Sequence, residues 1–343
     1  MGTIIPSCLI APTRTQERMS EPAKASSSRI AWIDVARGVA LIAMAIYHFA
    51  WDLEFFGYAP AGMTAFGGWK YFARGIASTF LFLVGVSLFL AHRKGVRWPP
   101  FWRRFAMVAV AAFAITAVTW FATPQSFIFF GILHQIAFAS VVGLLFLRLP
   151  PIVNVLAGVA IIAIAFVVAT PLLDGPLTWW IGLSEQRPRS NDFVPVFPWF
   201  GAVLLGVGAA GLAKREGLLV RLAMLAPGKW SRPLVFIGRH SLAFYLIHQP
   251  VLISLVWLFS QIAPPSVETR QSNFIASCRT ACTIERSEQF CAEYCGCVQR
   301  GLFSGQNAGS TPSQGADFQE RLREQVLLCT ASTEIIVPPE PEP

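Results

Sequence analysis

The stretch RIAWIDVARGVALIAMAIYHFAWDL, residues 29–53, has the length and apolar content of a helix that crosses a bilayer. Four of its side chains are nevertheless ionisable: Asp34, Arg37, His48 and Asp52. At about 100° per residue, all four fall on one stripe of the helix, and the rest of the surface is apolar. Because a charge that faces lipid is costly, we expect this stripe to face the interior of a helix bundle.

The composition of the whole chain is that of a membrane protein. Of its 343 residues, 54% are hydrophobic and 13% are charged, whereas a soluble domain has roughly 25% charged residues. Stretches of the length and apolar content of transmembrane helices lie at about 30–51, 72–91, 105–122, 127–147, 151–171, 196–213 and 234–260. The predicted fold class is an all-α polytopic membrane protein with about seven transmembrane helices.

The positions of the basic residues predict the orientation of the chain. Lys and Arg are frequent before the first predicted helix, between the second and third, and between the sixth and seventh, and they are rarer in the alternate connections. The positive-inside rule then places the N-terminus in the cytoplasm and, after seven crossings, the C-terminus outside. Membrane topology also explains the net charge of +8, so nucleic acid is not an expected partner.

Beyond about residue 260 the chain becomes polar and rich in cysteine. Six of its seven cysteines lie there: Cys278, Cys282, Cys291, Cys295, Cys297 and Cys329. An even number of cysteines on the outer face is typical of a disulfide framework. A zinc site is the alternative, because the two C-x3-C spacings are also loosely compatible with metal binding.

Helix geometry favours one of the possible disulfide pairings. Residues at i and i+4 share a helix face, so an antiparallel pair of short helices would join Cys278 to Cys295. The same hairpin would join Cys282 to Cys291. Cys297 would then remain for Cys329.

These patterns predict four segments of different character. They are a disordered cytoplasmic lead-in over 1–28, a transmembrane bundle over 29–260, a cysteine-rich helical hairpin over 261–302, and a linker, short helix and disordered end over 303–343.

Further polar side chains lie at membrane depth in the predicted bundle. An outer layer would contain His48, Asp52, Arg74, His134 and Asp192, and an inner layer Asp34, Arg37, Arg239, His240 and Ser241. Asp34 and Arg37 could form a purely structural ion pair, and hydrogen bonds between helices could account for the hydroxyl and amide groups. The histidines and arginines are better explained by a polar pathway through the bundle.

Three segments carry a family resemblance: IDVARGVALIAM in the first predicted helix, FLFLVGVSLFL in the second and FGILHQIAFA in the fourth. Together they resemble the catalytic-domain family of heparan-alpha-glucosaminide N-acetyltransferase, which has many bacterial members. The resemblance covers roughly 29–260, and its most specific part is the D-x-x-R-G element of Asp34, Arg37 and Gly38. The chain departs from the lysosomal enzyme in having no histidine in 57–71, and His134-Gln135 replaces a Gln-Arg pair of the family.

The resemblance implies transfer of an acetyl group from cytosolic acetyl-CoA to an amino sugar across the membrane. For a bacterial member, this means a multi-pass protein of the inner membrane with an envelope glycan as acceptor. The predicted orientation then makes the C-terminus periplasmic, and no metal is expected. His48, oriented by Asp52, would be the general base, and His134 would polarise the thioester carbonyl or move the proton. Phosphate groups of acetyl-CoA would be bound by Arg37, Arg239, Arg103 and Arg104. A covalent acetyl-histidine is an alternative.

Two other classes of function fit the same residues. A proton-coupled transporter would use the histidines as a proton path, although the sequence has no obvious inverted repeat of the kind found in many carriers. A membrane scaffold without enzymatic activity would bind an envelope partner through its disulfide-bonded tail. Binding or hydrolysis of labelled acetyl-CoA by purified protein would distinguish the enzyme from both.

Overall fold

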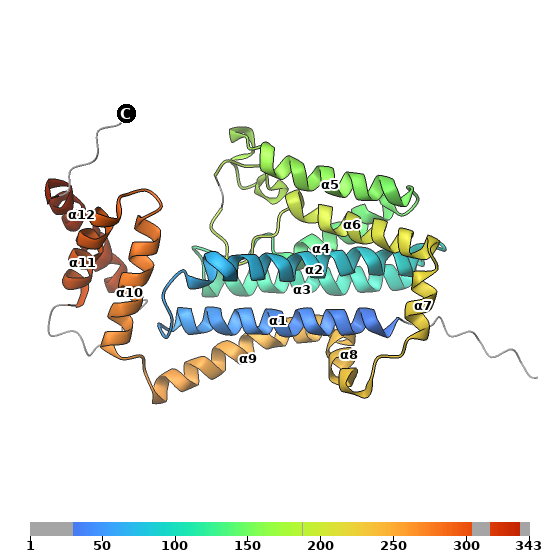
Figure 1. The fold of residues 1–343 in the computed structure, drawn as a ribbon, viewed down its shortest axis with the longest axis horizontal. Coiled ribbons are helices and arrows are strands. Elements are labelled where there is room, and N and C mark those ends of the chain that lie inside the picture. Colours follow the sequence, from blue (N-terminus) through green and yellow to red (C-terminus); the bar gives the residue numbers. More distant parts are fainter. Residues whose placement is uncertain (1–29, 187, 304–315, 337–343) are drawn as a thin grey trace, which may run out of the picture.

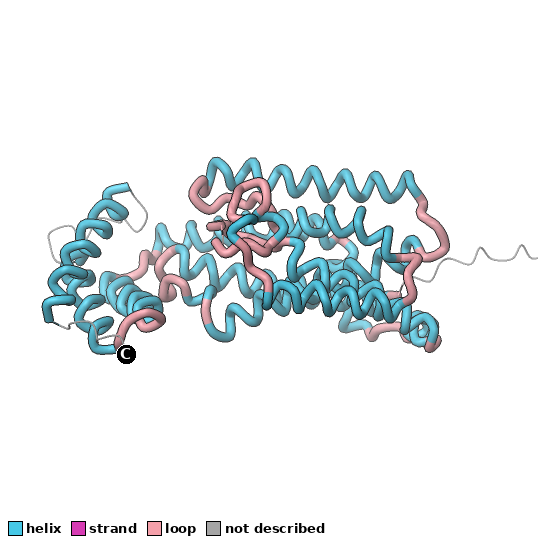
Figure 2. Tube along the Cα trace, turned by 90° about the horizontal axis from the view of Figure 1, so that it is seen from above, coloured by secondary structure: helices cyan, strands magenta, loops and turns pink. Residues whose placement is uncertain are grey.

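The computed structural model describes residues 30–186, 188–303 and 316–336, and all the regular secondary structure in these ranges is helical (Figures 1 and 2). The long apolar helices are α1 (Ala31–Phe55), α2 (Gly67–His92), α3 (Trp98–Ala122), α6 (Val196–Arg215) and α9 (Ser241–Ile262). Each of these five is long and apolar enough to cross a membrane. The prediction of an all-α polytopic membrane protein is confirmed.

The remaining helices of the bundle are shorter. They are α4 (Ile132–Phe146), α5 (Pro151–Val167), α7 (Leu218–Met224) and α8 (Arg232–Arg239). The apolar α4 and α5 have 15 and 17 residues, fewer than the roughly 20 that span a bilayer without thinning it. The expected single helix over 234–260 was wrong, because the chain breaks at His240 into α8 and α9.

Glycines allow the helices of the bundle to approach closely. A Cβ added to Gly85 of α2 would meet the backbone carbonyl of Val203 in α6, and one added to Gly206 of α6 would meet that of Phe82. Helices in lipid associate through such small residues, because burial of apolar side chains gives little driving force there.

A second pair of glycines lies where α8 packs on α1. A Cβ on Gly38 of α1 would meet the backbone of Leu234 in α8, and one on Gly238 would meet the backbone of Asp34. The short helix α8 therefore packs directly on the start of α1 before α9 begins. Figure 1 shows α8 at the end of the bundle where α1 begins.

Replacing Gly238 with alanine should destabilise the protein by about 1–3 kcal/mol, because the new methyl group would overlap rigid backbone of α1. The midpoint of thermal unfolding, followed by tryptophan fluorescence in detergent, measures the effect. Gly75→Ala is the matched control, since in the described part of the chain no atom beyond its own helix backbone lies within 4 Å of a Cβ at that position. If both variants lower the midpoint of thermal unfolding equally, α1 does not pack closely on α8.

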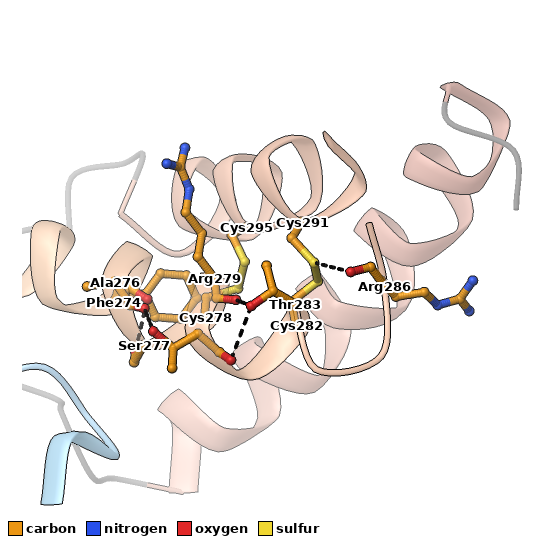
Figure 3. Close-up of a disulfide and its surroundings, with 11 residues drawn as sticks. Phe274, Ala276, Ser277, Cys278, Arg279, Cys282, Thr283, Arg286, Cys291 and Cys295 are labelled. Carbon is orange, nitrogen blue, oxygen red and sulfur yellow. Dashed lines mark hydrogen bonds between the residues drawn. A yellow bond between two sulfur atoms is a disulfide. The ribbon is translucent and has the colours of Figure 1, made fainter. Parts of the chain in front are cut away.

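The tail forms three helices beyond one end of the bundle, α10 (Val267–Cys282), α11 (Glu288–Phe303) and α12 (Ala316–Ile336) (Figure 1). The predicted disulfides are confirmed as Cys278–Cys295, Cys282–Cys291 and Cys297–Cys329, and Figure 3 shows the first two between α10 and α11. Because these six cysteines are paired in disulfides, their sulfur atoms cannot act as the thiolate ligands of the alternative zinc site. The predicted lead-in over 1–28, linker over 303–316 and disordered end lie almost wholly outside the described residues.

Hydrogen bonds join the tail to the loop that follows α1. The Tyr58 hydroxyl donates to the carbonyl of Ala263 at 2.6 Å, and the Asn273 amide donates to the carbonyl of Gly57 at 3.0 Å. The tail therefore lies against the end of α1 that carries His48 and Asp52.

Candidate functional site

The polar stripe of α1 faces the bundle, as its periodicity predicts. Asp34 and Asp52 are 1% and 0% exposed, and Arg37 and His48 are partly buried. His48 lies fourteen positions after Asp34, which corresponds to about 21 Å along the helix axis. The stripe therefore contributes to two separate polar clusters, one near each end of α1.

The first cluster is an ion-pair network around Asp34. Arg37 donates to Asp34 Oδ1 at 2.9 Å and also to the hydroxyl of Ser87 in α2. Arg239, at the end of α8, places its Nε 3.7 Å from Asp34 Oδ2. Asp34 and Arg37 thus form the ion pair that their spacing suggests. The further contacts of these two residues link α1 to α2 and α8. Arg239 is half exposed and can still accept an anion.

The second cluster joins α1 to α9 through two adjacent side-chain pairs. His48 Nδ1 lies 2.6 Å from His248 Nε2, and the Gln249 amide donates to Asp52 Oδ1 at 2.7 Å. The two imidazole rings are nearly parallel, at an interplanar angle of 15°. His248 and Asp52 are buried. A neutral amide donor thus satisfies one oxygen of the buried Asp52 carboxyl group.

Sequence reasoning placed Asp52 beside His48 but did not pair either residue with α9. The spacing i, i+4 within α1 suggests that Asp52 orients His48. In the structure the hydrogen bond of Asp52 goes to Gln249, and the ring contact of His48 goes to His248. The sequence feature that could have indicated these partners is the adjacent polar pair His248 and Gln249 in an otherwise apolar helix.

Glu54 anchors the loop next to this cluster, and the sequence analysis did not single it out. Its carboxylate accepts hydrogen bonds from the backbone N–H of Gly62 at 2.5 Å and from the N–H and hydroxyl of Thr64 at 2.9 and 2.8 Å. The Tyr47 hydroxyl contacts the carbonyl of the buried Thr64 at 3.4 Å. The loop is therefore fixed over the end of α1 that carries His48.

His134 lies at the start of α4, with contacts of its own. The backbone N–H of Gly131 donates to His134 Nδ1 at 3.2 Å, and His134 Nε2 lies 3.2 Å from the hydroxyl of Thr116 in α3. That hydroxyl donates to the carbonyl of Ile128. Among the described residues no contact joins His134 to His48. Both ring nitrogens of His134 have partners that hold the α3–α4 connection together.

Gln135 follows His134 and has an unusual environment. Its side chain is fully buried, and neither its oxygen nor its nitrogen has a hydrogen-bond partner among the described residues. A buried amide without partners costs free energy. In a membrane protein such a group is a candidate ligand contact.

Asp192 caps the N-terminus of α4, where its Oδ2 accepts from the backbone N–H of Ile132 at 2.9 Å. Burial raises the pKa of its carboxyl group from 3.8 to about 6, against the opposing effect of this hydrogen bond. The sequence predicts Asp192 and Arg74 in the same outer layer of polar side chains. In the structure Asp192 is partly buried, whereas Arg74 is exposed.

The raised pKa of Asp192 predicts that stability decreases with rising pH. Because the folded protein favours the protonated form, this contribution is complete below about pH 4 and is lost as the pH rises through about 6. It amounts to at most about 3 kcal/mol. Thermal unfolding of the wild type and of Asp192→Asn between pH 4 and 7.5 tests this, because asparagine can still accept from Ile132.

Asp192→Asn should show the weaker pH dependence. Other titratable groups near this carboxyl are Tyr47, Tyr245 and His134. The two phenols stay neutral in this range, and all three are unchanged in the variant. If the midpoint of thermal unfolding changes with pH to the same extent in the two proteins, Asp192 does not titrate as stated.

A cavity of about 180 Å³ lies between α2, α3 and α4, near the end of the bundle where α2 finishes. Its polar lining includes His92, Arg97, Arg104 and Ser140. Arg104 is thus placed where an anionic group could bind, whereas the exposed Arg103 is not part of the lining. The volume is below the roughly 300–1,000 Å³ of typical ligand pockets, so the cavity fits a phosphate group better than a whole cofactor.

The comparisons with known proteins give one result. The family model described as heparan-alpha-glucosaminide N-acetyltransferase, catalytic, matches residues 29–250. No curated protein and no solved structure matched the chain. The matched range includes both polar clusters, with His48, His248 and Gln249, and it ends before the disulfide-bonded tail.

Proposed function

Because this chain belongs to the heparan-alpha-glucosaminide N-acetyltransferase catalytic-domain family, we propose that it transfers an acetyl group from acetyl-CoA to a sugar amine or hydroxyl of the cell envelope. The observation that carries the proposal is the cluster of His48, His248, Asp52 and Gln249. It lies inside the bundle and within the matched residues.

In the proposed reaction, His48 is the general base. The acceptor nitrogen or oxygen attacks the thioester carbonyl while His48 takes its proton, and coenzyme A leaves as the thiolate, which then takes up a proton. Asp52 stabilises the protonated imidazole by its negative charge from one turn away. We also propose that His134, whose contacts lie at the α3–α4 connection, polarises the thioester carbonyl.

The basic groups at the opposite end of the bundle are proposed to bind the donor. Arg239 and Arg104 are the best placed of the predicted set, since the first is half exposed and the second lines the cavity. Arg37 is held by Asp34 and Ser87 and would contribute mainly by its charge. Arg103 is exposed and would attract the phosphate groups through its positive charge. The thioester arm would then extend about 16 Å along α1 from Arg37 to His48.

This arrangement is consistent with donor and acceptor arriving from opposite sides. We propose that the end with Asp34 and Arg239 faces the cytoplasm and that the tail is periplasmic, in a bacterial inner membrane. Disulfides in the tail fit an oxidising compartment. The proposed reaction uses side chains and acetyl-CoA and calls for no metal ion.

A proton-coupled transporter is the second candidate. The contact of 2.6 Å between His48 and His248 is a direct link for proton transfer between two helices. Such a protein would show proton movement in liposomes without any consumption of acetyl-CoA.

Labelled acetyl-CoA offered to purified protein in detergent, together with glucosamine as acceptor, tests the proposed function. Acetylated glucosamine, or an acetyl group bound to the protein, supports the acyltransferase. If correctly folded protein neither binds, hydrolyses nor transfers the label, the enzymatic proposal fails. Proton flux in liposomes would then support the transporter.

A further inference from the structure

We infer that His248 is a positioning residue that holds His48 in the tautomer with a free lone pair on Nε2. This inference rests on the proposed function, because it concerns the base of that reaction. It follows from the order of hydrogen bonds that runs from two backbone carbonyls through His248 to His48, and so to Nε2 of the His48 ring.

The first step fixes the proton on His248. Its Nδ1 lies 2.8 Å from the carbonyl oxygen of Tyr245 and 3.2 Å from that of Phe244. A carbonyl oxygen can only accept a hydrogen bond, so Nδ1 must carry the hydrogen. Both carbonyls belong to the preceding turn of α9, and they hold this hydrogen in place whatever the substrate does.

The second step transfers this constraint to His48. A neutral His248 with its hydrogen on Nδ1 has a lone pair on Nε2. That nitrogen lies 2.6 Å from His48 Nδ1, a distance that requires one N–H and one lone pair between the two atoms. His48 Nδ1 is therefore the donor and carries the hydrogen.

The third step gives the chemical consequence. With its hydrogen on Nδ1, a neutral His48 has its lone pair on Nε2. Among the described residues no group forms a hydrogen bond with His48 Nε2, so this basic nitrogen remains available for a substrate proton. In the opposite tautomer the same position would present an N–H and could not act as a base.

Packing supports the same role by fixing the ring of His248. Phe244 lies nearly parallel to it, at an interplanar angle of 3° and a centroid distance of 5.9 Å. The side chain of His248 is 8% exposed. The carbonyl–His248–His48 arrangement thus resembles the general pattern in which a third group orients a catalytic histidine, with main-chain carbonyls and a second imidazole in place of a carboxylate.

Nitrogen NMR of protein labelled with ¹⁵N-histidine tests the inference without any measurement of activity. An unprotonated ring nitrogen resonates far from a protonated one, and the signals of His48 are identified by their absence in His48→Gln. The expected result is a protonated Nδ1 and an unprotonated Nε2 in the wild type near neutral pH. A protonated Nε2 on neutral His48 would overturn the inference, and this readout does not depend on whether acetyl transfer occurs.

Two variants of His248 separate positioning from packing. His248→Leu removes the acceptor, so the hydrogen of His48 should shift towards Nε2 and kcat should fall roughly 10²- to 10⁴-fold, with KM little changed. His248→Gln retains an acceptor that can face His48 Nδ1, and it should restore the tautomer and much of kcat. If His248→Leu keeps the hydrogen on Nδ1, or if Gln is no better than Leu, His248 does not position His48.

Discussion

Acetyl transfer by His48→Ala is expected to be about 10²- to 10⁴-fold slower than by the wild type, which is the usual contribution of a general base. The variant removes the only imidazole of α1 and leaves the lone pair of His248 Nε2 without its partner. Initial rates with labelled acetyl-CoA and glucosamine measure the effect. If the proposed function is right, the loss appears mainly in kcat, because His48 acts on the proton that moves in the transition state.

The cavity left by His48→Ala provides a sharp control. Added imidazole can occupy the space beside His248 and accept the substrate proton, so it should partly restore transfer in His48→Ala and leave the wild type unchanged. Thr79→Ala changes an exposed site on α2 whose hydroxyl donates to the carbonyl of Gly75 in the same helix, and it should behave like the wild type. Wild-type rates in a folded His48→Ala protein would remove His48 from the mechanism.

The properties of single helices could be predicted from the sequence, because they depend on local periodicity. The burial of Asp34 and Asp52 follows from their common azimuth on α1, since each charge must avoid lipid. The disulfides between α10 and α11 follow in the same way from two cysteine pairs at i, i+4. In each case the prediction needed only the 3.6-residue repeat and one neighbouring element.

The contacts between distant helices could not be predicted in this way. His48 and His248 are 200 residues apart in the sequence, and no repeat in either helix specifies that they meet. The partner of Asp52 was also missed, because an intrahelical spacing suggested His48, whereas the hydrogen bond of Asp52 goes to Gln249 of α9. The break at His240 was missed as well, and the close approach of Gly238 to the backbone of α1 is a tertiary contact that no local pattern specifies.

Loss of the two disulfides between α10 and α11 is expected to unfold the tail while the bundle stays intact. The variant replaces Cys278, Cys282, Cys291 and Cys295 with serine. The two bonds close segments of 17 and 9 residues, and their loss together costs about 6 kcal/mol by loop-closure entropy. A domain of this size has a total stability of only roughly 3–9 kcal/mol.

Limited proteolysis in detergent measures this effect, with fragments identified by mass. In the variant, cleavage should concentrate in α10 and α11 while the bundle resists. Between the described residues of the tail and the bundle, the hydrogen bonds are few, such as those of Tyr58 and Asn273. Cys8→Ser is the matched control, since Cys8 is the one cysteine outside the tail. A tail as resistant as that of the wild type would mean that helix packing alone holds α10 against α11. The buried Phe290 and Val298 of α11 would then have to supply the stability assigned here to the disulfides.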